Sequence, residues 1–166
     1  MILTGDQIVK SVWEGDIYIS PFDYTRVNPN SYNYLLGNKL KVYKGIGDDG
    51  QNIFEEIMLD DSGYVLQPGT MYLGVTHETI GSSRYAMSLI GRSSIGRYGL
   101  FLQISANLGH TTSSHRWTLE LYACMPIRLY PMMPIGQVSF WNNLGEIRCM
   151  GKTYARFNDP QERFGR

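Results

Sequence analysis

The chain has 166 residues and no net formal charge; 43% of its residues are apolar and 18% are charged. This length fits a single domain that buries a core without disulfides. The composition excludes a disordered chain and a coiled coil, and the neutral charge balance argues against duplex DNA or an anionic membrane as the main partner. Eighteen glycines and twelve tyrosines favour β structure with many turns.

The first residues predict a short helix. Thr4 with Gln7 three residues later forms a capping-box pattern, Ile8 and Val12 recur at helical spacing, and Gly15 ends the run. Short alternating apolar runs follow, separated by turn residues, as is typical of an all-β barrel or sandwich. Strands are predicted near residues 17–19, 40–42, 64–80 with a break at 68–69, 85–90, 100–104, 117–122, 127–129 and 138–140, and a polar loop is predicted over 45–52.

Two cysteines, Cys124 and Cys149, are too few for a disulfide framework or a four-cysteine zinc site. No apolar run is long enough to cross a bilayer, and the chain does not open with a basic segment followed by an apolar one. We therefore expect a cytoplasmic protein with reduced thiols, in the host cytoplasm if its source is a virus. Neither nucleic acid nor membrane is expected as a partner.

The segment 91–100, GRSSIGRYGL, carries the densest polar signal, with two arginines, two hydroxyls and three glycines. Arginine binds phosphate oxygens in a bidentate manner, hydroxyls add short hydrogen bonds, and glycine lets backbone amides approach an anion. The segment matches neither a P-loop nor a dinucleotide fingerprint. On this pattern alone, a polyphosphate site and a surface turn with solvated arginines are both open.

Two further features have a possible chemical role. Alternation puts Glu120 opposite the apolar face of its strand, where it is either a general base in a cleft or an ordinary exposed glutamate. His110 and His115 lie five residues apart in a polar loop, without a third ligand at zinc-like spacing. The sequence also lacks the signature of zinc-dependent nucleobase deaminases and the Gly-x-Ser-x-Gly elbow of hydrolases. No zinc and no resident metal site are therefore expected.

Several segments together resemble the zinc-independent dCTP deaminases, one branch of the dUTPase superfamily. Segment 91–100 resembles their phosphate-binding motif, and segment 117–121, WTLEL, resembles the strand that carries their catalytic glutamate. The opening MILTGDQI and the stretches 27–37 and 68–78 are similar to other parts of the family. The resemblance extends from residue 1 to about residue 140.

The resemblance implies an all-β fold with a short N-terminal helix, namely a distorted β-barrel of the dUTPase-like (β-clip) type. It also implies a homotrimer with active sites between subunits, one barrel domain over residues 1–145, and a C-terminal arm or lid over residues 146–166. The implied reaction is the hydrolysis of dCTP to dUTP and ammonia, which supplies precursors of dTTP. Mg²⁺ is expected only on the triphosphate of the nucleotide.

The resemblance also assigns roles to residues. Glu120 takes a proton from the water that attacks C4 of cytosine, while Ser93, Arg97 and the Ala106 carbonyl order that water. The backbone of residues 104–106 contacts the pyrimidine edge. The full substrate-binding set is Arg92, Ser93, Ser94, Ile95, Gly96, Arg97, Ile104, Ala106, His110, Thr118, Leu119, Glu120, Arg156 and Gln161.

The chain departs from the family pattern at His110, where an aspartate that contacts the deoxyribose 3′-hydroxyl is usual, and at 111–115, which replaces glycines. Since that aspartate also serves the dUTP-hydrolysing relatives, a bifunctional deaminase–diphosphatase is less expected than an enzyme that stops at dUTP. Three alternatives stay open. They are a deaminase of dCMP or of another cytosine deoxynucleotide with a modified base, a dUTP diphosphatase, and a catalytically inactive nucleotide-binding trimer.

Overall fold

A computed structural model describes residues 1–149 and 158–161 of the chain. Strands dominate it, as the alternating sequence predicts. The elements in chain order are α1 (Gly5–Trp13), β1 (Ile17–Ser20), the 3-10 helix η1 (Tyr24–Arg26), β2 (Val27–Asn28), β3 (Ser31–Leu35), β4 (Lys39–Ile46), β5 (Asn52–Met58), β6 (Tyr64–Leu66), β7 (Met71–Ser82), β8 (Tyr85–Gly91), α2 (Ser93–Arg97), β9 (Leu100–Leu102), β10 (Leu108–Gly109), β11 (Ser114–Ala123), β12 (Ile127–Leu129) and β13 (Pro134–Asn142).

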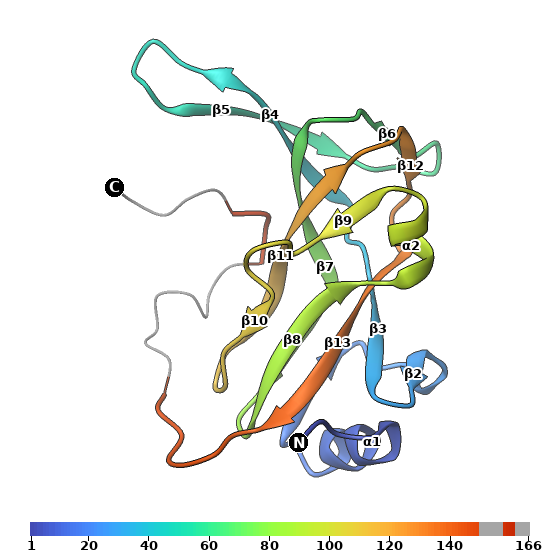
Figure 1. The fold of residues 1–166 in the computed structure, drawn as a ribbon, viewed down its shortest axis with the longest axis vertical. Coiled ribbons are helices and arrows are strands. Elements are labelled where there is room, and N and C mark those ends of the chain that lie inside the picture. Colours follow the sequence, from blue (N-terminus) through green and yellow to red (C-terminus); the bar gives the residue numbers. More distant parts are fainter. Residues whose placement is uncertain (150–157, 162–166) are drawn as a thin grey trace.

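The strands of the described residues form two large antiparallel sheets and one small one. The first sheet has the order β5-β4-β7-β11-β9 with β1 also paired to β7, the second has the order β10-β8-β13-β3-β2, and β6 pairs with β12. Side chains from both large sheets meet in one core, to which the fully buried Leu40, Leu119, Leu121, Tyr32, Met87 and Phe140 belong. The result is the predicted all-β architecture, a distorted β-barrel (Figure 1).

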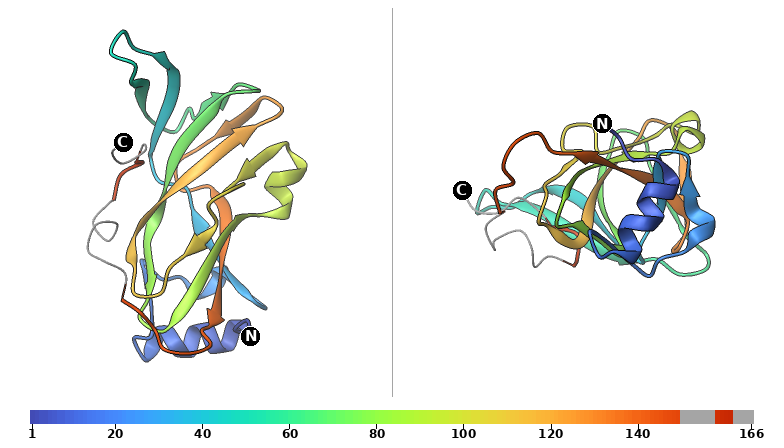
Figure 2. Two further views of the ribbon diagram at one scale, coloured as in Figure 1. Left: turned by 60° about the vertical axis from the view of Figure 1, so that its left-hand side comes forward. Right: turned by 90° about the horizontal axis from the view of Figure 1, so that it is seen from below.

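Helix α1 closes one end of the barrel, and the hairpin of β4 and β5 projects at the other end (Figures 1 and 2). The predicted cap is present, because the Thr4 hydroxyl accepts a hydrogen bond from the backbone N–H of Gln7 at 3.4 Å. Ile8 is buried, whereas Trp13 at the other end of the helix is exposed. No helix among the residues described is long and apolar enough to span a membrane.

The prediction of a polar loop over 45–52 is wrong at both ends. β4 runs on to Ile46 and β5 begins at Asn52, so only the turn between them is irregular. A register shift after Tyr43 lets the hairpin continue, and Gly45 adopts a φ of +137° that a side chain would strain. The ring of Tyr43 packs edge-on against Phe54, with 5.8 Å between the centroids.

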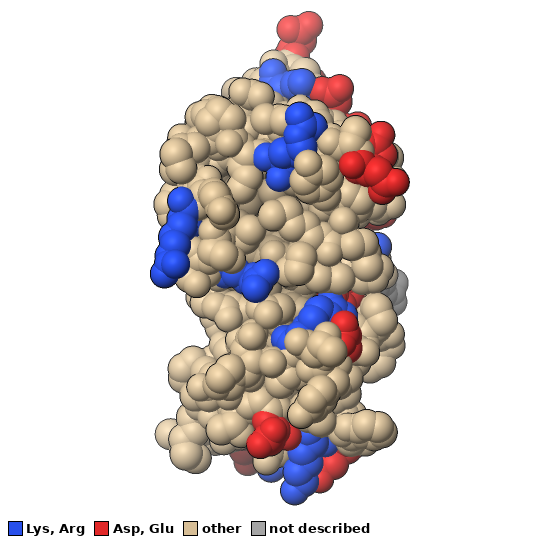
Figure 3. All heavy atoms as spheres, turned by 90° about the vertical axis from the view of Figure 1, so that its right-hand side faces the viewer, with Lys and Arg blue, Asp and Glu red and all other residues tan. Residues whose placement is uncertain are grey.

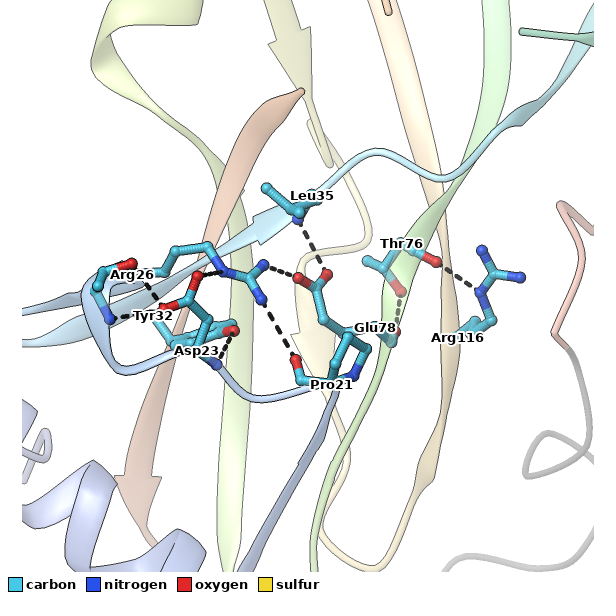
Figure 4. Close-up of polar contacts among 9 residues, drawn as sticks. Pro21, Asp23, Arg26, Tyr32, Leu35, Thr76, Glu78 and Arg116 are labelled. Atoms are coloured by element: carbon cyan, nitrogen blue, oxygen red, sulfur yellow. Dashed lines mark hydrogen bonds and ion pairs between the residues drawn. The ribbon is translucent and has the colours of Figure 1, made fainter. Parts of the chain in front are cut away.

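A buried carboxylate ties the 3-10 helix to both large sheets (Figure 4). Glu78 on β7 has no exposed side-chain surface; the Arg26 guanidinium contacts its Oε1, and the backbone N–H of Leu35 donates to its Oε2 at 3.0 Å. Arg26 also lies 3.4 Å from Asp23 Oδ2 and 5.0 Å from the centroid of the Tyr32 ring. Burial raises the pKa of the Tyr32 hydroxyl to about 12. The Arg26 guanidinium therefore balances the charge of Glu78 inside the protein.

We expect Glu78→Gln to lower the free energy of unfolding by about 3–5 kcal/mol, because the amide keeps the shape but removes the buried counter-charge of the largely buried Arg26 guanidinium, which keeps only its contact with the half-exposed Asp23. Urea denaturation measures this change. The control is Glu55→Gln in the exposed Lys44–Glu55 pair, where the loss should stay below about 1 kcal/mol. Equal losses in the two variants would contradict a specific role for the buried pair.

Candidate functional site

Glu120 lies on β11 where β9 ends. Its backbone carbonyl accepts from the N–H of Gln103 at 3.1 Å, and its own N–H donates to Gln103 Oε1 at 2.6 Å. Its carboxylate Oε2 accepts a hydrogen bond from the Ser105 hydroxyl at 3.3 Å. Leu119 and Leu121 on either side are fully buried. The carboxylate therefore points away from the core, as alternation predicts, and toward the loop that follows β9.

The Ala106 carbonyl belongs to the same group of residues. It accepts a hydrogen bond from Gln103 Nε2 at 3.0 Å, so a single side-chain amide contacts both the Ala106 carbonyl and the backbone of Glu120. Ile104, which follows Gln103 in the sequence, is 65% exposed. The structure thus brings together Ile104, Ala106 and Glu120, which sequence reasoning had assigned to one site.

Gln103 and the side chain of Ser105 are the parts of this group that sequence reasoning missed, because only the backbone of Ser105 belonged to the predicted site. Both are polar positions in the run FLQIS, where alternation alone suggests an ordinary strand. Gln103 is buried, so its amide must find partners inside the protein. A buried glutamine next to a candidate base is the signal that, with the fold known, identifies it.

The motif at 91–100 forms the short helix α2 and the residues on either side of it. It is not the surface turn that the sequence left open as one interpretation. Ile95 is buried and anchors the helix, whereas Ser93, Ser94 and Arg97 are exposed. Arg92 precedes the helix, and its Nη1 donates to the Pro134 carbonyl at 3.3 Å. On the face of the molecule that carries α2, basic groups stand out singly from a largely uncharged surface (Figure 3). The motif therefore presents hydroxyls and guanidinium groups to solvent.

Glu120 and α2 do not meet within one chain. Helix α2 precedes β9, and the loop 103–107, which contacts Glu120, follows β9. Helix α2 and this loop therefore lie toward opposite ends of the short strand (Figure 1). Within residues 1–149 and 158–161, no hydrogen bond or ion pair joins Glu120 to residues 92–97. One chain alone does not bring the carboxylate to the hydroxyls and arginines of the motif.

The histidines do not form a pair. His110 is exposed at the turn between β10 and β11, while the His115 ring is buried, with Nδ1 2.9 Å from the Arg116 carbonyl and its centroid 4.1 Å from that of Trp117. Burial lowers the pKa of His115. Among the residues described, no group of three His, Cys, Asp or Glu side chains is arranged to hold a metal ion.

The C-terminal segment 158–161 lies against β11 just before Glu120. The N–H of Gln161 donates to the Thr118 hydroxyl at 3.0 Å, which brings together two residues of the predicted site. Asn158 Oδ1 accepts from the N–H of Arg116 at 3.3 Å, and Asp159 pairs with Lys39 at 3.1 Å. These contacts hold this part of the tail beside the strand that carries Glu120.

Four members of the predicted set have a more limited role or none that can be described. The side chains of Ile95 and Leu119 are buried in the core, which leaves their backbone for contact with a ligand. Arg156 lies outside the described residues. Gly96 lies within α2 with open space around its Cα, so it does not restrict approach to the helix.

Comparisons with known proteins show the family to which the chain is similar. A family model described as dCTP deaminase-like matches residues 2–143. The "dCTP deaminase, dUMP-forming" of Clostridium botulinum is 43% identical over 148 residues, which cover 88% of this chain and 85% of the relative. The "dCTP deaminase" of Rhodopirellula baltica is 40% identical over 164 residues, covering 97% of this chain and 82% of the relative.

A solved structure supports the fold. The crystal structure of 2'-deoxycytidine 5'-triphosphate deaminase from Agrobacterium tumefaciens aligns with a TM-score of 0.69 at 20% identity. The alignment covers 86% of this chain but only 48% of that one, so the chain spans about half the length of that protein. Since the family match covers most of the chain, including α2, the loop after β9 and the strand of Glu120, this chain belongs to the dCTP deaminase-like family.

Proposed function

We propose that this protein is a hydrolytic deaminase of dCTP. The observation that carries the proposal is the junction of β9 and β11, where the Glu120 carboxylate, the Ser105 hydroxyl and the Ala106 carbonyl are held together. The names of relatives 43% and 40% identical to the chain support the same substrate. The substrate is the Mg²⁺ complex of dCTP, with the metal carried by the nucleotide.

In this proposal Glu120 is the general base. It takes one proton from a water whose other proton is hydrogen-bonded to the Ala106 carbonyl, and the water oxygen bonds to C4 of cytosine. As the adduct forms, the electron pair of the C4=N3 bond moves to N3. The adduct collapses when the bond from C4 to the exocyclic amino nitrogen breaks, Glu120 returns its proton to the departing ammonia, and the remaining hydroxyl proton moves to N3 to give uracil. Ser105 donates a hydrogen bond to the carboxylate, which limits the directions it can adopt. The reaction needs no metal at the base.

The phosphates and the far side of the water require α2. Arg92 and Arg97 suit the phosphate oxygens, while Ser93 and Ser94 add short hydrogen bonds to the nucleotide or the water. Because α2 and Glu120 do not meet in one chain, we propose that α2 of a neighbouring copy completes each site in a homotrimer. Such an assembly has three identical sites, each built from two subunits.

An apolar strip on the outer face of the first sheet supports association. Phe101, Tyr122 and Met71 are register partners across β9, β11 and β7, and they are 46%, 36% and 41% exposed. A strip of this kind, beside the candidate site, is typical of a surface that another subunit covers. We propose that residues 1–145 form the barrel and that residues 146–166 act as a lid, with Gln161 beside Thr118 as its contact to β11.

The product is the point at which the comparisons change the sequence-based expectation. Sequence reasoning expected dUTP, because His110 replaces an aspartate used by dUTP-hydrolysing relatives. The name of the Clostridium botulinum relative favours dUMP. We therefore propose that a second water bonds to the α-phosphorus while the bond from this phosphorus to the oxygen that bridges to the β-phosphate breaks. Diphosphate and dUMP leave the enzyme, and the proton of that water is released to solvent.

A product assay tests this reaction directly. Purified protein with Mg²⁺ is offered dCTP, dCDP, dCMP and dUTP, and we expect ammonia, dUMP and diphosphate in equal amounts from dCTP. Because no zinc takes part, a zinc chelator should leave the rate unchanged. Formation of dUTP without diphosphate would refute the dUMP product but keep the deaminase. Turnover of dCMP alone, or of none of the four nucleotides, would refute dCTP deamination.

Glu120→Gln tests the base. The amide cannot accept the proton, so we expect deamination to fall by roughly 100-fold or more. Nucleotide affinity, measured by calorimetry, should stay within about tenfold, or about 1.4 kcal/mol. Glu55→Gln on the projecting hairpin is the matched control and should keep the wild-type rate. Near-normal turnover by Glu120→Gln would rule out this residue as the base.

Mixing two inactive variants tests whether subunits share sites. Glu120→Gln keeps α2 intact, and Arg97→Ala keeps the carboxylate intact. After refolding together in equal amounts, a site between two subunits receives both intact groups in about one quarter of cases, and we expect about a quarter of wild-type activity. If each chain formed its own site, the mixture would stay as inactive as its components.

A further inference from the structure

Gln103 takes the place of a backbone group in the sheet. The ladder of β9 and β11 ends at the pair Leu102 and Leu121, and continuing its register places Gln103 opposite Glu120. The N–H of Gln103 donates to the Glu120 carbonyl as in a regular ladder, but the N–H of Glu120 donates to the side-chain Oε1 of Gln103 at 2.6 Å. The side-chain amide thus accepts the hydrogen bond that the backbone carbonyl of residue 103 accepts in a regular ladder.

The backbone of Gln103 explains the exchange. Its φ of +51° lies in the left-handed region, which turns the chain out of the ladder and starts the loop 103–107. A residue with a side chain adopts this conformation at a cost of about 1 kcal/mol or more, and glycine would adopt it with little strain. A glycine, however, would leave the N–H of Glu120 without its acceptor. The hydrogen bonds of the Gln103 side chain therefore have to offset the cost of its left-handed backbone.

The other end of the same amide holds the candidate water-binding group. Gln103 Nε2 donates to the Ala106 carbonyl at 3.0 Å, and the residue as a whole is only 7% exposed. A carbonyl oxygen has two lone pairs, so one remains for a further donor while the first fixes its direction. One buried amide therefore sets the separation between the Glu120 backbone and the Ala106 carbonyl.

We propose that Gln103 is a positioning residue of the deaminase, which holds the Ala106 carbonyl in register with Glu120 so that both contact the same attacking water. This proposal rests on the proposed function. Gln103 itself touches neither the water nor the nucleotide in this scheme. Its effect should appear in kcat, since the group that it orients binds the water and not the phosphates or the sugar.

Gln103→Glu tests the two ends of the amide separately. At high pH the introduced carboxylate still accepts from the N–H of Glu120 but turns an anionic oxygen toward the Ala106 carbonyl. Burial beside that carbonyl raises the pKa of the introduced carboxyl, and its protonated form supplies an O–H donor where Nε2 was. As the pH falls, protonation of the introduced carboxyl therefore restores a hydrogen-bond donor to the Ala106 carbonyl.

We expect kcat of Gln103→Glu to be roughly 10- to 100-fold below wild type at about pH 9, and this deficit to shrink toward about pH 6, with KM for dCTP changed less than about threefold. The matched control is Gln137→Glu on β13, where the native amide oxygen accepts from the Ser31 hydroxyl at 2.9 Å. Its rate relative to wild type should not vary with pH. A deficit of Gln103→Glu that is constant across this range, or no deficit, overturns the positioning role.

Amide hydrogen exchange tests the bridge without relying on activity. The N–H of Glu120 should exchange slowly in wild type and in Gln103→Glu, and faster in Gln103→Met, which lacks an acceptor. If wild type fails to deaminate dCTP but this pattern holds, the proposed function fails and the bridge stands. Unchanged protection in Gln103→Met overturns the bridge. If neither variant folds, the exchange of the Gln103 side-chain amide protons in the wild-type protein is measured instead. Rapid exchange of these protons would also overturn the bridge.

Discussion

The open edge of β11 is the constraint on which the candidate site depends. β11 pairs with β7 along most of its length, but β9 covers its other edge only at residues 121–123. Backbone groups beyond that point must find other partners. Gln103 Oε1 accepts from the N–H of Glu120, and Asn158 Oδ1 accepts from the N–H of Arg116. In the described part of the chain, side-chain acceptors take the place of a further strand for these two N–H groups.

This way of completing the edge leaves space for chemistry. The chain leaves the ladder at Gln103, and the loop that follows sets the Ser105 hydroxyl and the Ala106 carbonyl beside Glu120. The C-terminal segment continues along the same edge, with Gln161 on Thr118. The site and the tail are therefore two consequences of one short strand, β9.

The opposite edge of β11 is fixed by an irregularity in β7. Arg116 pairs with Thr79 and Thr118 pairs with Val75, so residues 76–78 lie opposite Trp117 alone. The Thr76 hydroxyl satisfies this bulge, because it accepts from the N–H of Trp117 at 2.9 Å and donates to the Glu78 carbonyl at 2.7 Å. The Glu78 side chain enters the core and meets Arg26 there (Figure 4). A change of register at this bulge would turn Glu120 to the other face of the sheet.

The local features and the list of reactive groups could be predicted from the order of the residues. The Thr4 cap, the alternation that turns Glu120 away from Leu119, and the polar composition of 91–100 depend on neighbours in the chain, so they were predictable. Three features became visible only in the folded chain: Gln103 replaces a backbone acceptor, Glu78 is buried against Arg26, and β4 and β5 extend into the expected loop. Each of these features depends on a partner distant in sequence or on a left-handed or bulged backbone. Hydrophobic periodicity predicts neither of the two. The separation of α2 from Glu120 belongs to the same class, because only the path of β9 through space places them apart.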